Sequence, residues 1–363
     1  MRATAGRSFS SRRRIPQGTR DRKKIGPSGH PVKEAGGLSD RRIFVSRRLP
    51  EAVLAPLRSL GTVEVWPEET VPPPREVLLE AAARARAMLT LITDRIDAEM
   101  IERAESLAII ANMAVGYNNI DVAAARRRGI WVTNTPDVLT ETTADLVMAL
   151  LLAAMRRLPQ AERALRERQW QGWSPFDFVG LDVHGKRLGI FGMGRIGRAV
   201  ARRARGFDME ILYHNRRRLP EAVERGIPAR YVDFAALVQE SDVLVILAPY
   251  APELYHRFNR EVLYGMKRGA VLIVASRGGI VDEAALVEVL RAGHLAAAGL
   301  DVFETEPIPP DHPLLTVENA VLLPHIGSAT VETRLKMAER AVDNIVRVLT
   351  GRPPRDPVDA DGP

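Results

Sequence analysis

The sequence predicts an α/β protein in which two domains are built on parallel sheets. Short apolar runs alternate with helical stretches from residue 42 to about residue 350, a pattern typical of repeated βα units. A glycine-rich turn at residues 192–197 opens a second series of such units. With 363 residues, the chain is long enough for two domains that each bury a core.

The first half of the chain contains a βα series without a phosphate-binding glycine turn. Strands are expected at the apolar runs 43–45, 62–65, 87–91, 107–110 and 130–132. Helical stretches separate them at residues 50–60, 75–84, 97–104 and 119–128. Because a helix lies between consecutive strands, these strands are predicted to form a parallel sheet.

A long helix and a tryptophan-containing loop follow this first series. The helix, expected at residues 142–157, is apolar on nearly every side and should be buried between domains or subunits. Trp170 and Trp173 come next, close to glycine and proline. Exposed tryptophans favour an interface loop, and the alternative is a loop folded onto its own domain.

The turn at residues 192–197 has the GxGxxG pattern of a dinucleotide-binding site. Its three glycines allow a sharp turn after the strand, close approach of backbone N–H groups to a pyrophosphate, and close packing of helix on strand. The pyrophosphate would lie at the helix N-terminus. The residues predicted to bind it are Gly192, Gly194, Arg195, Ile196 and Gly197.

The next strand, expected at residues 210–213, ends where an NAD site would place an acidic side chain for the ribose 2′-hydroxyl. This chain has Asn215, Arg216 and Arg217 there. No carboxylate repels a 2′-phosphate, and a guanidinium can bind it in a bidentate manner. The sequence therefore predicts a preference for NADP(H), whereas surface arginines exposed to solvent are the alternative interpretation.

Polar side chains follow the later strands of the second series, which are expected at residues 243–246, 271–274, 296–302 and 321–323. Arg277, Glu306 and His325 come from the loops after the last three of these strands. In open α/β sheets the ligand site lies at the carboxyl ends of the strands. Reduction of a 2-oxo acid needs a cation, a proton donor and a carboxylate that keeps the donor protonated, and these three residues match those needs.

The composition of the chain argues against several other classes of function. The net charge of +7 comes entirely from residues 1–40, which hold ten Lys or Arg and three acids, so the rest is neutral and no DNA-binding surface is indicated. We expect this extension to be disordered, either idle or a targeting peptide. The chain has no cysteine, and neither a membrane span nor a metal-ligand cluster stands out.

Taken together, these motifs resemble the D-isomer-specific 2-hydroxyacid dehydrogenases. The resemblance covers about residues 42–352. It rests on the glycine turn, Arg277 with Gly278, residues 299–303, Glu306 with Pro307, and residues 324–330. Within that family, residues 112–122 and 132–140 are similar to glyoxylate and hydroxypyruvate reductases.

The resemblance implies a role for each residue of the site. Arg277 would bind the oxo acid, His325 would be the general acid, and Glu306 its partner. Backbone N–H groups of Val115 and Gly116 would receive the substrate carboxylate. Further contacts are implied for Ile92 and Thr93 with the substrate, and for Pro249, Ser276 and Asp301 with the coenzyme, Asp301 near the nicotinamide carboxamide.

The implied fold is two Rossmann-like, doubly wound domains with the site in the cleft between them. The flavodoxin-like substrate domain would comprise residues 41–138 plus 328–352, and the NAD(P)-binding domain residues 139–327. Residues 353–363 are expected to be a tail. A homodimer would form through the long helix and the tryptophan loop.

Two positions depart from the family pattern. Val274 stands where Asn is common, which removes a supporting hydrogen bond, and Met113 stands where the similar reductases often carry Tyr. We expect a cytoplasmic reductase of glyoxylate and hydroxypyruvate that prefers NADP(H), with NAD(H) as the alternative coenzyme and with no nucleic-acid or membrane partner. Another D-2-hydroxyacid dehydrogenase, such as a phosphoglycerate dehydrogenase, or a nucleotide-sensing corepressor remains an alternative.

Overall fold

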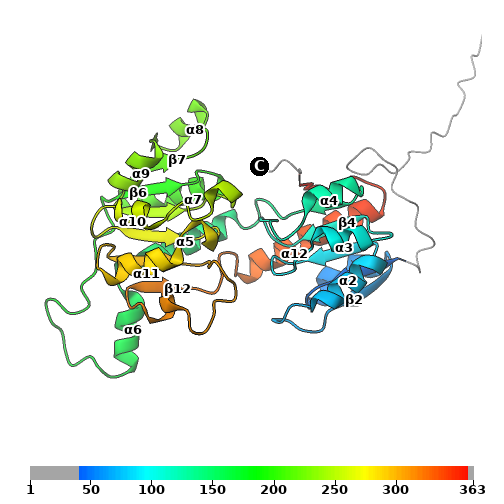
Figure 1. The fold of residues 1–363 in the computed structure, drawn as a ribbon, viewed down its shortest axis with the longest axis horizontal. Helices are drawn as coiled ribbons and strands as arrows, with labels where there is room; N and C mark the ends of the chain where they lie inside the picture. The colour runs from blue at the N-terminus through cyan, green and yellow to red at the C-terminus, as the bar shows by residue number, and fades with distance from the viewer. Residues whose placement is uncertain (1–40, 359–363) are drawn as a thin grey trace, which may run out of the picture.

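The computed structural model describes residues 41–358 and places their helices and strands in two lobes (Figure 1). The predicted extension of residues 1–40 lies outside the described residues. Each lobe has one parallel sheet between two layers of helices, so the predicted α/β fold with two doubly wound domains is confirmed. Among the described residues, no helix combines the length and apolarity needed to cross a bilayer.

The first sheet has the strand order β2-β1-β3-β4-β5, which is the flavodoxin-like order expected for the substrate domain. Its side chains alternate between two cores, as the period of two in a strand requires. Helices α1 and α12 cover one face, and α2, α3 and α4 cover the other. The elements are β1 Arg42–Val45, α1 Glu51–Arg58, β2 Thr62–Val65, α2 Arg75–Arg84, β3 Ala87–Thr90, α3 Ala98–Arg103, β4 Ile109–Asn112, α4 Val122–Arg127, β5 Trp131–Thr133 and α12 Val331–Leu349.

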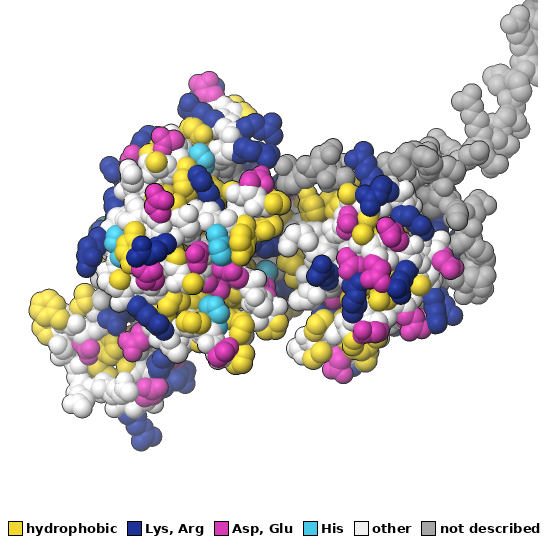
Figure 2. Space-filling view, viewed as in Figure 1, with side chains coloured by type: hydrophobic (Ala, Val, Ile, Leu, Met, Phe, Trp, Pro, Cys, Tyr) yellow, Lys and Arg dark blue, Asp and Glu magenta, His cyan; other side chains and the backbone are white. Residues whose placement is uncertain are grey.

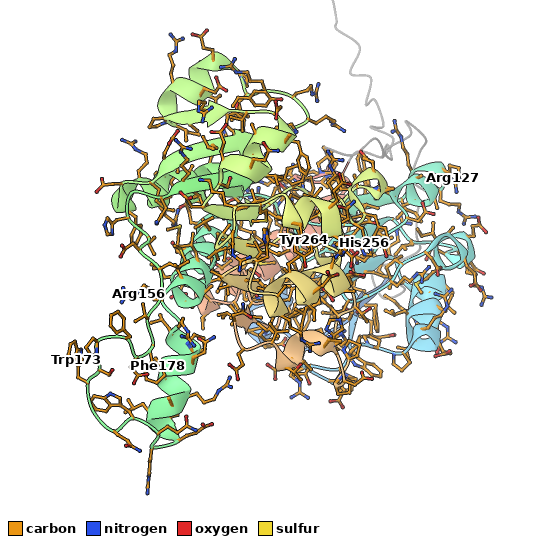
Figure 3. The ribbon with its side chains drawn as sticks, turned by 60° about the vertical axis from the view of Figure 1, so that its left-hand side comes forward. Arg127, Arg156, Trp173, Phe178, His256 and Tyr264 are labelled. Atoms are coloured by element: carbon orange, nitrogen blue, oxygen red, sulfur yellow. The ribbon has the colours of Figure 1, made fainter. Side chains whose placement is uncertain are left out.

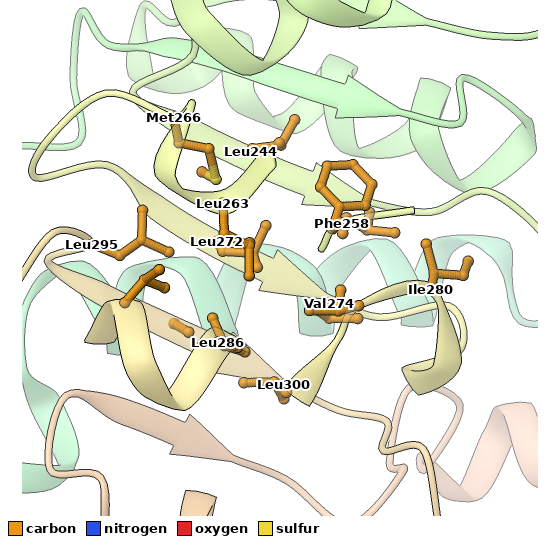
Figure 4. Packing of buried hydrophobic residues seen from close by; sticks show 14 of the residues in the cluster. Leu244, Phe258, Leu263, Met266, Leu272, Val274, Ile280, Leu286, Leu295 and Leu300 are labelled. Carbon is orange, nitrogen blue, oxygen red and sulfur yellow. The ribbon is translucent and has the colours of Figure 1, made fainter. Parts of the chain in front are cut away.

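The second sheet has the order β12-β11-β10-β9-β6-β7-β8, and the order reverses between β9 and β6. This reversal is the point at which open α/β sheets bind ligands. Helices α5 and α7 pack on one face, and α9, α10 and α11 on the other (Figure 4). The elements are α5 Thr140–Met155, α6 Leu158–Arg166, β6 Arg187–Phe191, α7 Arg195–Ala204, β7 Glu210–His214, α8 Glu221–Gly226, β8 Ala229–Tyr231, α9 Phe234–Glu240, β9 Val243–Ile246, α10 Arg260–Tyr264, β10 Val271–Val274, α11 Glu283–Arg291, β11 Ala297–Leu300 and β12 Ala320–Leu322.

The last helix returns to the first lobe, as the family resemblance implies. In Figure 1, α12 lies in the lobe of α3, α4 and β4, although it follows the last strand of the other lobe. The segment after it also belongs to this lobe. Val358 N–H donates to Val132 O at 2.9 Å, and Asp356 accepts two hydrogen bonds from Arg340 of α12 at 2.7 and 2.9 Å. Residues 355–358 are therefore docked against the first sheet.

The long helix differs from its expected position. It runs from Thr140 to Met155, two residues earlier than expected at each end, and it packs on the second sheet. After it, α6 and the loop of residues 167–182 project from the second lobe (Figures 1 and 3). Trp173 and Phe176 in this loop are 84% and 86% exposed. We call residues 158–182 the arm.

Candidate active site

Three neighbouring strands place the predicted catalytic side chains at one edge of the second sheet. Strands β10, β11 and β12 are adjacent and parallel, so their carboxyl ends point the same way. Arg277, Glu306 and His325 lie in the loops that follow these strands. The structure therefore brings together residues that are up to 48 positions apart in the sequence.

Glu306 and His325 form a carboxylate–imidazole pair. His325 Nδ1 lies 2.7 Å from Glu306 Oε2, and both side chains are 32% exposed. The other carboxylate oxygen of Glu306 accepts the Phe303 N–H at 3.0 Å. Burial alone would raise the pKa of Glu306, but the hydrogen bond and charge of His325 outweigh it and lower the pKa. Since Nδ1 is engaged, Nε2 of His325 is the nitrogen left to face a ligand.

Asp301 connects two of the three loops from a buried position. Its carboxylate accepts the N–H groups of Ile326 and Gly327 at 2.7 and 2.8 Å. Burial raises the pKa of Asp301, although these two N–H groups oppose the shift. The residue that follows the strand β11 therefore fixes the backbone next to His325.

Arg277 reaches from the second lobe to the first. Its Nε donates to Asn118 Oδ1 at 3.1 Å, and its Nη1 donates to the Ser276 carbonyl at 2.6 Å. A methyl group on Gly116 would lie 1.8 Å from Nη2 of Arg277, so the guanidinium rests directly against the Gly116 backbone. Burial lowers the pKa of Arg277, and the charge of Glu306 acts in the opposite direction.

Asparagines whose role was not predicted from the sequence shape the first-lobe side of the site. Asn112 Nδ2 donates to the Gly116 carbonyl at 2.9 Å, and Asn134 Nδ2 donates to the Val115 carbonyl at 2.8 Å. No backbone acceptor in the described part of the chain takes the N–H of Val115 or Gly116. Both carbonyls are thus satisfied while both N–H groups remain available to a ligand.

The turn at Ile92 and Thr93 is held by a buried ion pair. Arg47 Nη2 donates to Thr93 Oγ1 at 2.9 Å, and Arg47 Nη1 lies 3.2 Å from Asp94 Oδ1. Ile92 is partly buried beside this pair. Met113, one of the two departures from the family pattern, is buried in the first core.

The chain matches known proteins over most of its length. Residues 148–327 match the family model of the D-isomer specific 2-hydroxyacid dehydrogenase, NAD binding domain. A glyoxylate reductase of Korarchaeum cryptofilum is 49% identical over 314 residues, which cover 86% of this chain and 94% of that protein. The chain belongs to the D-isomer-specific 2-hydroxyacid dehydrogenases. It is an NAD(P)-dependent oxidoreductase, so the family and the class of enzyme predicted from the sequence are confirmed.

Solved structures of similar proteins share the whole fold of this dehydrogenase. A protein from Thermus thermophilus superposes with a TM-score of 0.82 at 46% identity, covering 88% of this chain and 100% of that one. A second match is the NADPH-dependent glyoxylate/hydroxypyruvate reductase of Sinorhizobium meliloti, in complex with NADP and malonate. It has a TM-score of 0.77 and 36% identity, with 89% of this chain and 98% of that one covered.

The glycine turn of the dehydrogenase has the form that the pyrophosphate of a dinucleotide requires. Gly192 has a φ of +107°, and a Cβ there would lie 2.3 Å from the Ala248 nitrogen. A Cβ on Gly197 would lie 2.5 Å from the Gly192 oxygen, whereas Gly194 at the start of α7 has nothing within 4 Å of its Cβ position. The turn is packed where it supports the sheet and open where the pyrophosphate would lie, so these residues fit the coenzyme.

Two of the residues predicted to bind pyrophosphate also contact the first lobe. The Arg195 side chain forms an ion pair with Asp137 at 2.8 Å, and both side chains are 61% exposed. Ile196 packs against hydrophobic residues of both lobes. Coenzyme binding at this turn would therefore also act on the junction between the two lobes.

The predicted ribose and nicotinamide contacts lie along the same edge of the second sheet. Asn215 Oδ1 accepts the Met193 N–H at 2.7 Å, so this side chain also fixes the glycine turn. Arg216 and Arg217 are exposed and have no ion-pair partner among the described residues. Pro249 is exposed after β9, and Ser276 Oγ is buried without a hydrogen-bond partner in residues 41–358. A buried hydroxyl without a partner fits a site that a polar ligand completes.

Proposed function

We propose that this dehydrogenase is an NADP(H)-preferring reductase of small 2-oxo acids, with glyoxylate and hydroxypyruvate as substrates. The observation that carries the proposal is the His325–Glu306 pair at 2.7 Å beside an arginine that reaches the Gly116 turn. The Korarchaeum relative and the Sinorhizobium reductase named above support the same substrate class. A small substrate suits the close contact between Arg277 and Gly116.

In the proposed reduction, each polar group of the site has a distinct task. Arg277 binds the carboxylate or the carbonyl of the oxo acid, and the free N–H groups of Val115 and Gly116 receive the carboxylate. When bound, the coenzyme supplies the hydride that is added to C2. His325 Nε2 donates a proton to the carbonyl oxygen, which becomes the hydroxyl of the product. Glu306 remains ionised and stabilises the imidazolium before the transfer.

The coenzyme would be held by the turn at residues 192–197 and by the loop after β7. Arg216 and Arg217 are the groups proposed to bind a 2′-phosphate, supported by their exposure and their lack of ion-pair partners among the described residues. A charge-assisted contact of this kind contributes about 1.5–3 kcal/mol, or roughly 10- to 150-fold in affinity. Ser276, Asp301 and Pro249 are the proposed neighbours of the nicotinamide half.

Steady-state kinetics test both parts of this proposal. With glyoxylate or hydroxypyruvate as the oxo acid, the purified enzyme should have a higher kcat/KM for NADPH than for NADH. The double substitution Arg216→Ser with Arg217→Ser should remove that preference. Arg225→Ser, which replaces a surface arginine in α8, is the control.

His325→Ala should lower kcat by about 10²- to 10⁴-fold with little change in the KM for coenzyme. Equal or better use of NADH contradicts the coenzyme assignment, and unchanged turnover of the His325 variant contradicts the mechanism.

We also propose a homodimer and the domain limits given by the sequence. Exposed apolar side chains gather on the arm, at the lower left of Figure 2, and a helix face of α5 adds Ala149 and the partly buried Leu146 and Ala153. Such a surface suits a second copy of the chain, since exposed apolar patches mark interaction sites.

The proposed domain limits are residues 41–138 plus 328–352 for the substrate domain and residues 139–327 for the coenzyme domain. Residues 355–358 add to the substrate domain.

A further inference from the structure

Two glutamates outside the catalytic trio exchange hydrogen bonds between the Arg277 loop and the Glu306 loop. Glu283 is the first residue of α11, only five residues after the strand-end loop of Arg277 and Gly278. Its N–H donates to Glu304 Oε1 at 3.0 Å, and its Oε1 accepts the Glu304 N–H at 2.7 Å. The two residues thus form a reciprocal pair, which we call the glutamate brace.

A histidine completes the brace on each side. His312 Nε2 lies 3.1 Å from Glu283 Oε2, and His256 Nε2 lies 3.0 Å from Glu304 Oε1. The Leu314 N–H donates to His312 Nδ1 at 3.3 Å, so the neutral ring carries its proton on Nε2 and can donate it to Glu283. Figure 2 shows histidine and acidic side chains side by side on the front of the second lobe, in the half nearer the first lobe.

The glutamate brace lies next to the backbone segment that holds Glu306. A Cβ on Gly278 would lie 1.9 Å from the Phe303 carbonyl carbon and 2.3 Å from the Glu304 nitrogen, so the two loops are in backbone contact. Phe303, next to Glu304, donates its N–H to Glu306 Oε1. Fixing Glu304 therefore fixes the donor that orients the Glu306 carboxylate toward His325.

We propose that Glu283 is a positioning residue for the proposed reduction, because its buried carboxylate holds the Glu304 backbone and thereby keeps Glu306 aimed at His325 Nδ1. This inference rests on the proposed function, in which His325 is the proton donor. Glu283 touches neither Glu306 nor His325 through a hydrogen bond, so its action passes through the loop. Only 4% of Glu283 is exposed, which is unusual for a carboxylate without a structural or functional reason.

The charges around the brace determine its pH dependence. Burial raises the pKa of Glu283, with the Glu304 N–H and His312 opposing the shift and the charge of Glu304 adding to it. Protonated Glu283 would present a hydroxyl to the Nε2–H of His312, so the brace requires the ionised form. Charged or titratable groups face each of these residues. Glu283 faces Glu304, Glu306 and His312, and Glu304 faces His256. Glu306 faces Arg277 and His325, His325 faces Glu306 and Asp301, and Asp301 faces Arg334.

The test compares kcat/KM pH profiles of the full-length enzyme and Glu283→Gln. In the proposed reduction His325 donates the proton, and a misaligned Glu306 supports the imidazolium less, so the alkaline side of the kcat/KM profile reports on this pair. We expect kcat to fall by about 10- to 100-fold and the alkaline decline to move to lower pH by about half a unit or more, with an unchanged KM for coenzyme. Glu288→Gln is the control, because Glu288 lies on the same helix and pairs with Arg260 on the surface.

Substitutions of His312 provide a second test if Glu283→Gln does not fold. His312→Phe removes the donor to Glu283 and should reproduce the shift of the alkaline limb, whereas His312→Gln retains an N–H donor and should restore the profile. A lower melting temperature with the wild-type pH profile in both Glu283→Gln and His312→Phe would overturn the inference. If His325→Ala keeps its turnover, the proposed function itself fails, so the two failures are distinguishable.

Discussion

The contact between Gly116 and Arg277 makes one backbone position decisive for the substrate binding proposed above. Even a methyl group at Gly116 would lie 1.8 Å from Arg277 Nη2, so Gly116→Ala must displace the guanidinium. We expect the KM for the oxo acid to rise, and kcat/KM to fall, by about 10- to 100-fold, because small displacements of a positioning group have effects of this size. The KM for the coenzyme should not change.

Gly206→Ala is the matched control for that substitution. A Cβ on Gly206 has nothing within 4 Å, so the same added methyl group should leave the kinetics unaltered. Initial-rate measurements over a range of glyoxylate concentrations distinguish the two variants. A Gly116 variant with wild-type kinetics would mean that Arg277 does not bind the substrate from this position.

At the residue scale, the sequence could indicate which side chains meet but not what supports them. Arg277, Glu306 and His325 follow three strands of one parallel sheet, and parallel strands end at the same edge. The support from Asn118 and Glu283 depends on the paths of loops, and contacts across 159 and 21 residues leave no periodic signal. The available hint was an Asn-rich segment directly after Gly116.

At the scale of a single element, strand β7 connects stability, through Tyr213, to the loop proposed to bind the coenzyme. The Tyr213 hydroxyl donates to Glu224 and accepts the Leu219 N–H at 3.1 Å, so it fixes the segment that follows Arg216 and Arg217. Burial, with the Glu224 contact, raises the pKa of Tyr213 to about 12. The folded state thus favours the neutral phenol more than the unfolded chain does, where the pKa is about 10.

The sign of this shift gives a prediction for alkaline pH. The stabilising contribution of Tyr213 is fully present below pH 10 and is lost as the pH rises toward 12, amounting to about 2.7 kcal/mol. In urea unfolding, wild type should therefore exceed Tyr213→Phe in free energy of unfolding at pH 9, and the difference should shrink by pH 11.5. A difference that stays constant over this range would show that Tyr213 does not titrate as described.

Element predictions from the sequence succeeded where burial imposed a simple pattern. The continuous apolar runs of β9 and β10 are strands buried on both faces, as expected for a covered parallel sheet. Strand β8 was not predicted, because it has three residues with Arg230 in the middle and exists through pairing with β7. The ends of α5 shifted by two residues, since its apolar composition does not mark a boundary.

At the scale of the whole molecule, the sequence pattern alone could not specify where the chain passes from one lobe to the other. The return of α12 to the first lobe was implied by the family resemblance. The docking of residues 355–358 was not expected, and it depends on Asp356, which is 9% exposed and binds both Arg340 and Asn344. A short polar segment with no apolar periodicity carries no local sign of such a contact.

The arm leads to a prediction about assembly. Leu158, Leu165, Trp170, Trp173 and Phe176 are each more than half exposed, and Figure 3 shows Trp173 on the projecting loop. A stable interface buries about 800 Å² on each partner, and aromatic side chains contribute most to such surfaces. We therefore expect wild type to sediment as a dimer, and the double substitution Trp173→Ser with Phe176→Ser to sediment as a monomer at micromolar concentration.

The control for the arm is the substitution of an exposed apolar side chain elsewhere. Val71→Ser replaces a side chain that is 55% exposed on the first lobe, and this variant should remain dimeric. Because Trp173 and Phe176 project into solvent in the single chain, their loss should leave its melting curve cooperative and its sheets intact. A wild-type enzyme that sediments as a monomer at micromolar concentration, or an arm variant that stays a dimer, would place the subunit interface away from these aromatic side chains.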